Sequence, residues 1–180
     1  MFKLLIGFLA AITVAAGSLG AEPEPLEFKG VKLGMTEQEL QKIVEVECSN
    51  AKPTADRLCI KHLDSIAKVP ATISYSLFSD KVLHIYIRTG NPQKNFSYIK
   101  DALVAKYGPP TKFFASELTN RMGAKFLDET LLWKRSYGNI EARKYAGSIE
   151  NSMVTFASPL FEEAAARRRG ESAKIGAKDL

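Results

Sequence analysis

The spacing of hydrophobic positions changes along the chain, and each change predicts a different element. Over residues 36–46 the apolar side chains recur at helical intervals. Thr36 and Glu39 stand three residues apart at the start of this segment and form a T-x-x-E capping box. Strict alternation of apolar and polar residues then predicts strands at 71–78 and 82–88, joined as a hairpin.

The second half of the chain has the same order of patterns. Residues 95–107 carry an apolar stripe at helical spacing, and Gly108 follows as a stop signal. Alternating segments separated by polar turns then predict an antiparallel meander. Its strands are expected at 112–118, 130–135, 140–145 and 153–158.

These elements predict an α+β fold of two α-then-β-meander units, with the helices packed on one face of an antiparallel sheet. The domain is expected to span residues 28–158, with a possible tandem repeat of 28–90 and 92–158. A single α+β layer without duplication is the alternative. Residues 159–180 are expected to form a C-terminal helix and a mobile tail.

Residues 1–21 have the pattern of a signal peptide: a short basic start, an apolar segment and a run of small residues. Residues 22–27 are expected to be a linker. The alternative is an uncleaved anchor, but residues 4–19 are shorter than the roughly 20 residues that span a bilayer. We therefore expect a periplasmic or secreted protein without a transmembrane segment after cleavage.

The chain has two cysteines, Cys48 and Cys59, and in an exported protein the default prediction is a disulfide between them. A reactive thiol or a metal site is the alternative, because Cys59 and His62 form a C-x-x-H pair. A closed zinc site needs four ligands, and His84 is the only other soft donor. We predict no metal and no cofactor.

The net charge of +5 is mildly basic. Nucleic-acid-binding proteins usually have a denser basic stripe, so nucleic acid is not an expected partner. Residues 167–169 are three consecutive arginines, but two glutamates precede them, and pairing within a terminal helix explains them. Peripheral contact with an anionic surface is the alternative.

Three short motifs resemble known exported proteins. They are G-V-x-L-G-M-T-x-x-E-L at 30–40, the hairpin around Asp80, and K-Y-G-P-P at 106–110. In element order the chain resembles the BamE (SmpA/OmlA) family of outer-membrane assembly lipoproteins and the tandem-repeat β-lactamase inhibitor proteins. The resemblance implies a small exported module that binds other proteins, and it assigns no functional residue. Unlike the assembly lipoproteins, the chain has no cysteine at the end of its leader to carry a lipid.

Candidate catalytic residues are few. His62, Asp64 and Ser65 are close neighbours on one segment, which makes the geometry of a Ser-His-Asp triad difficult to reach. The glutamates at 37, 39, 45 and 47 are most simply the polar face of the first helix. No phosphate-binding glycine loop is present in the sequence. We therefore predict a non-enzymatic protein and keep a small hydrolase as the least favoured alternative.

The candidate binding surface is the sheet face opposite the helices. If Leu83, Ile85 and Ile87 face the core, the residues between and after them face outward. Aromatic and arginine side chains on such a face are typical of protein interfaces. The candidates are His84, Tyr86 and Arg88, joined on the later strands by Trp133 or Lys134 and by Arg143 or Lys144. The alternation there is ambiguous and leaves open which member of each pair faces outward. The predicted function is an exported adaptor or inhibitor that binds another envelope or secreted protein. An envelope-associated structural protein held at an anionic surface is the alternative.

Overall fold

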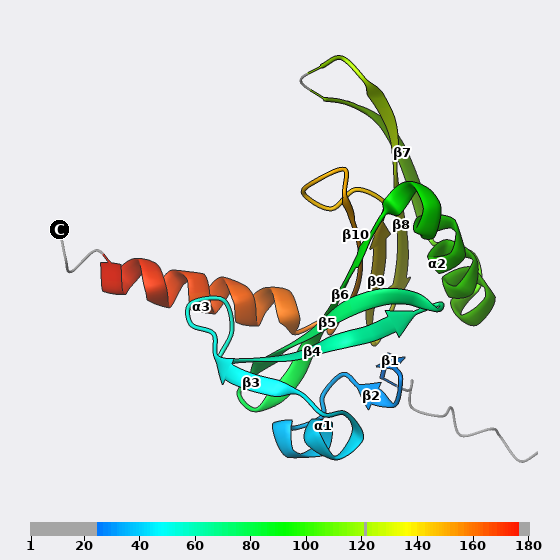
Figure 1. Ribbon diagram of the computed structural model, residues 1–180. Helices are drawn as coiled ribbons and strands as arrows, with labels where there is room; N and C mark the ends of the chain where they lie inside the picture. The colour runs from blue at the N-terminus through cyan, green and yellow to red at the C-terminus, as the bar shows by residue number, and fades with distance from the viewer. Residues whose placement is uncertain (1–24, 121, 177–180) are drawn as a thin grey trace, which may run out of the picture.

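The computed structural model describes residues 25–120 and 122–176. In these ranges eight strands form one antiparallel sheet, in the order β3-β4-β5-β6-β10-β9-β8-β7, and two short strands form a separate hairpin (Figure 1). The sheet strands are β3 (Glu47–Asn50), β4 (Arg57–Ile66), β5 (Val69–Phe78), β6 (Lys81–Gly90), β7 (Lys112–Thr119), β8 (Lys125–Arg135), β9 (Gly138–Arg143) and β10 (Asn151–Ala157). The last strand therefore lies in the middle of the sheet, between β6 and β9.

Helix α1 (Glu37–Ile43) begins at the predicted cap. The Thr36 hydroxyl accepts from the backbone N–H of Glu39 at 3.2 Å, and the Glu39 carboxylate accepts from the backbone N–H of Thr36 at 2.8 Å. This reciprocal pair satisfies two N–H groups that an uncapped helix leaves free. The helix ends three residues earlier than predicted, because Val44 is already extended.

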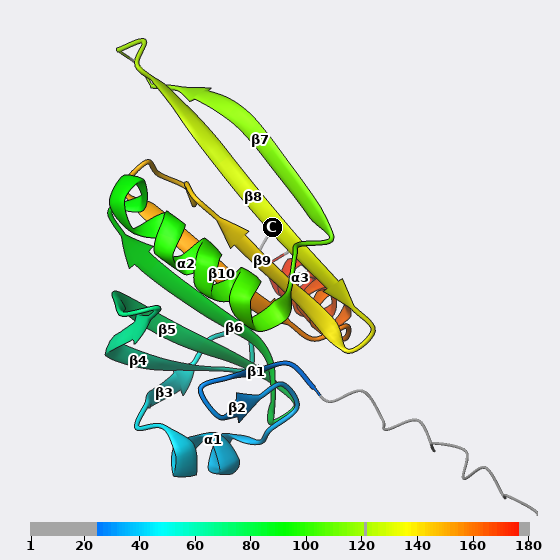
Figure 2. The same cartoon turned by 90° about the vertical axis from the view of Figure 1, so that its right-hand side faces the viewer.

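Helix α2 (Pro92–Tyr107) crosses one face of the sheet, as Figure 2 shows. A proline in its first turn needs no N–H partner there, and Gly108 ends it with a positive φ of 76°. Its apolar stripe, Phe96, Ile99 and Leu103, is buried in the core. The predicted helix in this region is confirmed, with three more residues at its start.

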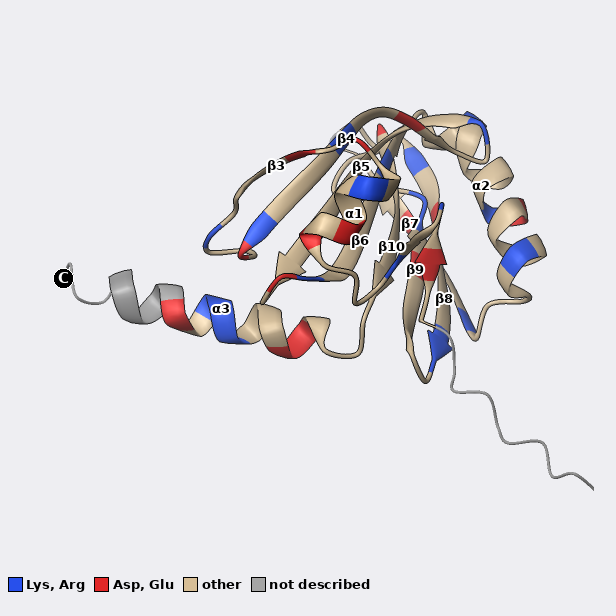
Figure 3. Ribbon diagram, turned by 90° about the horizontal axis from the view of Figure 1, so that it is seen from below, with Lys and Arg blue, Asp and Glu red and all other residues tan. Residues whose placement is uncertain are grey.

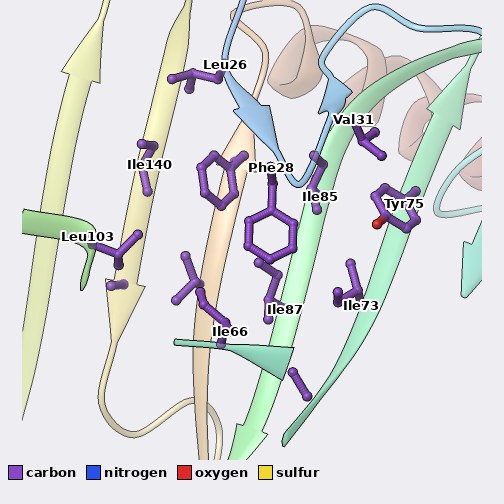
Figure 4. Packing of buried hydrophobic residues seen from close by; sticks show 14 of the residues in the cluster. Leu26, Phe28, Val31, Ile66, Ile73, Tyr75, Ile85, Ile87, Leu103 and Ile140 are labelled. Atoms are coloured by element: carbon purple, nitrogen blue, oxygen red, sulfur yellow. The ribbon is translucent and has the colours of Figure 1, made fainter. Parts of the chain in front are cut away.

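The main core lies between α2 and the sheet. The hairpin of β1 (Glu27–Phe28) and β2 (Val31–Lys32) closes it at the side, with Phe28 and Val31 buried. Figure 4 shows these two side chains among inward-facing residues of several strands, including Ile85 and Ile87 of β6. We call this side of the sheet, covered by α2, α1 and the hairpin, the closed face.

Helix α3 (Phe161–Gly176) packs on the opposite side of the sheet. Ala164 and Ala165 are buried against Phe78 and Leu83, and the helix then extends away from the sheet (Figure 1). A bulge between β5 and β6 turns Leu83 toward this helix. The expectation that Leu83 shares a face with Ile85 and Ile87 was therefore wrong, because the bulge shifts the alternation by one residue.

The predicted fold class was wrong. Strands hold 48% of the residues and helices 23%, and the strands of both halves join in one sheet through the pairing of β6 with β10. The helices do not form a layer on one face, since α2 and α3 lie on opposite sides. Local patterns gave no signal for the β6–β10 pairing, which joins segments about 65 residues apart along the chain.

The predicted signal peptide lies outside the described residues. Of the predicted linker, Leu26 is buried at 4% exposure and Glu27 begins β1. No helix within the described ranges is both long enough and apolar enough to cross a bilayer.

Candidate protein-binding face

The middle strands of the sheet turn one set of alternate residues away from the closed face. On β6, Ile85 and Ile87 are fully buried, while Tyr86 is half-buried and Arg88 is exposed. We call the side that carries Tyr86 and Arg88 the open face. Strand alternation alone separates these two sets, because successive side chains point to opposite sides of a sheet.

The strand register extends the open face across the sheet. Arg88 stands opposite Met153 of β10, and Met153 stands opposite Arg143 of β9. Two arginines from distant parts of the chain therefore flank one methionine, in a row that Thr130 of β8 continues. Directly paired side chains lie about 4.5–5.5 Å apart at Cβ, so this row is a continuous strip.

A second row of the same kind lies beside the first. Tyr86 pairs with Thr155, which pairs with Glu141 and then with Leu132. All four side chains are half-buried. The open face thus combines aromatic, aliphatic and charged groups at partial exposure, the composition that suits a protein interface.

A buried carboxylate orients Arg143. Its Nε donates to Asp128 Oδ2 at 3.3 Å, and the other oxygen of Asp128 accepts from the backbone N–H of Tyr145 at 3.0 Å. Asp128 is 3% exposed, whereas the Arg143 side chain is 44% exposed. The hydrogen bond to Asp128 uses Nε, and the partly exposed side chain leaves its guanidinium accessible to a ligand carboxylate.

Arg88 has no acidic partner within ion-pair distance in the part of the chain that the structure describes. It borders a pocket of about 350 Å³, together with Thr72 and Asn151. Leu63 also lines this pocket and is 98% exposed. An unpaired arginine next to an exposed leucine offers a partner one ionic and one apolar contact.

Helix α3 covers His84. The imidazole stacks on the ring of Phe161, with centroids 4.2 Å apart and planes 9° from parallel. Burial there lowers the pKa of His84 to about 4, so the ring is neutral at pH 7. His84 does point away from the closed face as predicted, but α3 occupies it.

Trp133 does not belong to the open face. Its side chain is fully buried on the closed side, and its Nε1 donates to the backbone oxygen of Gly108 at 2.8 Å. Lys134, the next residue, is exposed and pairs with Asn139 on the open side. The sequence left the choice between Trp133 and Lys134 open, and the structure assigns the outward position to Lys134.

Of the predicted residues, the structure brings Tyr86, Arg88, Lys134 and Arg143 to the accessible part of one face. Sequence reasoning missed Met153, Leu132 and Leu63. The alternation in β10 could have assigned Met153 to the side opposite Val154. The sequence does not reveal that β10 lies beside β6, which is what places Met153 between the two arginines.

The predicted disulfide is confirmed as a bonded pair. Cys48 and Cys59 stand directly opposite on β3 and β4, with their sulfurs 2.01 Å apart. The Glu37 carboxylate lies near both sulfurs, and within residues 25–120 and 122–176 these three form the group of potential ligand atoms that lie within 4.8 Å of one another. Both sulfurs are already bonded, so they offer no thiolate to a metal. His62 lies outside this group.

The Ser-His-Asp arrangement that the sequence made difficult to reach is not assembled among the described residues. Asp64 forms an ion pair with Lys29 and accepts from the backbone N–H of Ser65 at 2.6 Å. His62 is exposed, and none of the hydrogen bonds found among the described residues joins it to Ser65. The bulge in β4 between Lys61 and Asp64 separates the two ends of this segment.

Charges of both signs are interspersed along α2, α3 and the strands, as Figure 3 shows. Comparisons with protein-family models, curated proteins and solved structures found no match to this chain. The resemblance to the assembly lipoproteins and the inhibitor proteins therefore stays a prediction.

Proposed function

We propose that the chain is an exported, non-enzymatic module that binds another envelope or secreted protein through the open face. One observation carries the proposal. Among the residues that the structure describes, α3 is the only helix on one side of the middle strands, and the part of that side it leaves uncovered presents two arginines around a methionine.

The chemistry of this face indicates the partner surface. Arg88 and Arg143 favour carboxylates, since guanidinium groups bind them through paired hydrogen bonds. Met153 and Tyr86 supply apolar area between and beside these charges. The matching surface is an apolar patch bordered by aspartate or glutamate. The predicted leader and the disulfide support an oxidising compartment for this encounter.

The test is capture from an envelope extract by the tagged mature protein. A photo-crosslinking residue in place of Met153 should yield one stoichiometric protein adduct. The double variant Arg88→Glu and Arg143→Glu should weaken capture at least about tenfold, because it places like charges against the acidic partner. Lys94→Glu is the matched control, since Lys94 is an exposed cation on α2, on the other side of the sheet.

Three outcomes would contradict the proposal. Capture that survives in the double variant would place binding elsewhere. Sedimentation with anionic vesicles or peptidoglycan that salt abolishes, without a protein adduct, would favour the envelope-associated structural role. Turnover of a substrate that is lost on changing His62 would favour the hydrolase alternative.

A further inference from the structure

Strand β7 forms one margin of the sheet and is almost completely uncovered. It pairs with β8 on one side, and no strand pairs with its other side among the described residues (Figure 2). Seven of its eight residues are exposed, and Leu118 is half-buried. A row of backbone N–H and C=O groups therefore faces solvent along the length of this strand.

The far half of this strand also projects from the sheet. Strand β8 pairs with β9 only from Thr130 to Arg135, whereas β7 continues along β8 to Lys125. Residues 115–119 and 125–129 thus form a two-stranded ribbon beyond β9, which Figures 1 and 2 both show. A lone two-stranded ribbon gains little stability in water, so a further strand at its edge would stabilise it.

Two usual protections of an edge strand, a β-bulge and a proline, are missing from β7. Its pairing with β8 is regular over all eight positions without a bulge, and it contains no proline. Phe113 and Phe114 point to opposite sides and are each 55% exposed. An edge of this length with exposed aromatic residues is a template for pairing with another strand.

We infer that β7 pairs antiparallel with β7 of a second copy of this chain, with the two-fold axis at Ser116. Such an axis runs normal to the sheet, so residues on one side of one copy meet residues on the same side of the other. With the axis at Ser116, Phe114 meets Leu118 and Phe113 meets Thr119. Both are pairs of an aromatic with an aliphatic or β-branched residue, which stabilise sheets.

The neighbouring register is chemically poor, which makes this one specific. An axis at Ala115 would place Lys112 opposite Leu118 and Phe113 opposite Glu117, so each charge would meet an apolar group. With the axis at Ser116, the large apolar side chains of Phe113 and Leu118 meet no charge. Glu117 meets only the small side chain of Ala115, and no charge in the strand meets its like.

Charge also favours a second copy over a partner of opposite sign. The chain as a whole carries +5, yet β7 contains one lysine and one glutamate and is neutral. The Glu117 carboxylate is already paired with Lys125 of the same ribbon at 2.9 Å. Two identical edges therefore approach without repulsion, and the edge offers no charge that selects a basic or acidic partner.

The mass of the mature protein in solution tests the pairing. Light scattering after size exclusion should give twice the monomer mass, and Phe114→Glu should halve it by placing a charge against Leu118 of the other copy. Tyr98→Glu is the matched control and should leave the dimer intact, because Tyr98 is 59% exposed on α2. A monomeric unmodified protein at every accessible concentration would overturn the inference.

Single cysteines test the register. The native cysteines are bonded to each other, so an introduced one is the only free thiol. Ser116→Cys should crosslink two chains on mild oxidation, since opposite Cα atoms lie about 4.5–5.5 Å apart. Ala115→Cys should not crosslink, because its two copies would lie roughly 8 Å apart and beyond disulfide reach. Equal crosslinking of both variants would overturn the register.

The two proposals for this protein fail separately. Phe114 lies in the open-face row, opposite Thr130, so the separating variant is Phe113→Glu, on the other side of the sheet opposite Leu131. It places a charge against Thr119 of the other copy, and the resulting monomer should still capture the open-face partner. Dimers that persist in the double variant Arg88→Glu and Arg143→Glu would support edge pairing, and dimers lost in that variant would contradict it.

Discussion

The two faces of the sheet are built from the same strands, but their side chains differ in burial. On the closed face the strand side chains are packed beneath α2 and the β1–β2 hairpin, and many have no exposed area. On the open face the alternate residues keep partial exposure and include two arginines and one methionine in a single row. Stability should therefore depend mainly on the closed face and recognition on the open face.

This division also separates two kinds of polar group. On the closed face, Trp133 donates its one N–H to a backbone oxygen, and no buried side-chain nitrogen or oxygen of the described residues lacks a hydrogen-bond partner. On the open face, Arg143 donates from Nε to Asp128, while its side chain stays partly exposed to water. A group that binds a partner must keep donors unpaired until the partner arrives, so such groups are excluded from the closed face.

The largest predicted difference between the two faces is between two consecutive residues of β8, Trp133 on the closed face and Lys134 on the open face. Trp133→Ala should destabilise the protein by about 3–5 kcal/mol, because it removes the largest buried side chain and leaves a cavity. Lys134→Ala should change the free energy of unfolding by less than about 0.5 kcal/mol, since its side chain is exposed on the other side. Urea unfolding followed by circular dichroism measures both.

Circular dichroism is needed here because Trp133 is the chain's only tryptophan and its loss removes the fluorescence signal. Equal losses of stability in the two variants would mean that the assignment of faces on β8 is wrong.

Trp133 and Lys134 also show how much of the fold could be predicted from the sequence. The sequence located the strands from β5 to β10, although it placed the start of β8 five residues late. Alternation carries this signal in β5, β6 and β10, where successive residues differ in burial. It could not decide which side of β8 is covered, since Thr130–Arg135 contains apolar residues at both parities. The bulge at Leu83 and the insertion of β10 beside β6 depend on contacts between distant segments, and these leave no local pattern.

The candidate site was predicted to a similar extent. Tyr86 and Arg88 follow from alternation against the buried Ile85 and Ile87. The cover that α3 places on His84 was not predictable, because Ala164 and Ala165 make a weak apolar stripe in a polar segment. A helix that packs through alanines and one phenylalanine has no strong hydrophobic signature.

A smaller effect, the pH dependence of stability, tests the cover that α3 places on His84. His84 has its pKa lowered to about 4 by burial, so the unfolded chain binds a proton below pH 6.5 that the folded chain does not. Stability contributed by the neutral ring is present above pH 6.5 and is lost as the pH falls toward 4. Between pH 7 and 4.5 the expected loss is about 1–3 kcal/mol.

His84→Phe is the reference variant for this titration, because a phenyl ring can stack on Phe161 without gaining a proton. The difference between the two proteins isolates the imidazole. The carboxylates with lowered pKa values, those of Glu37, Glu39, Asp64 and Glu129, lose their stabilisation only below about pH 4.5. Identical pH profiles for the two proteins would show that α3 does not cover His84 in solution.

The smallest predicted effect concerns the capped start of helix α1, at the margin of the closed face. Thr36→Ala should destabilise by about 1 kcal/mol, because the backbone N–H of Glu39 loses its acceptor. Gln38→Ala in the same helix is the control and should be nearly neutral, since Gln38 is exposed. Helix α1 is seven residues long and reaches the core through the buried Leu40, so its cap matters only if that contact holds the helix in place. An unchanged unfolding midpoint for Thr36→Ala would mean that α1 adds little to the closed face.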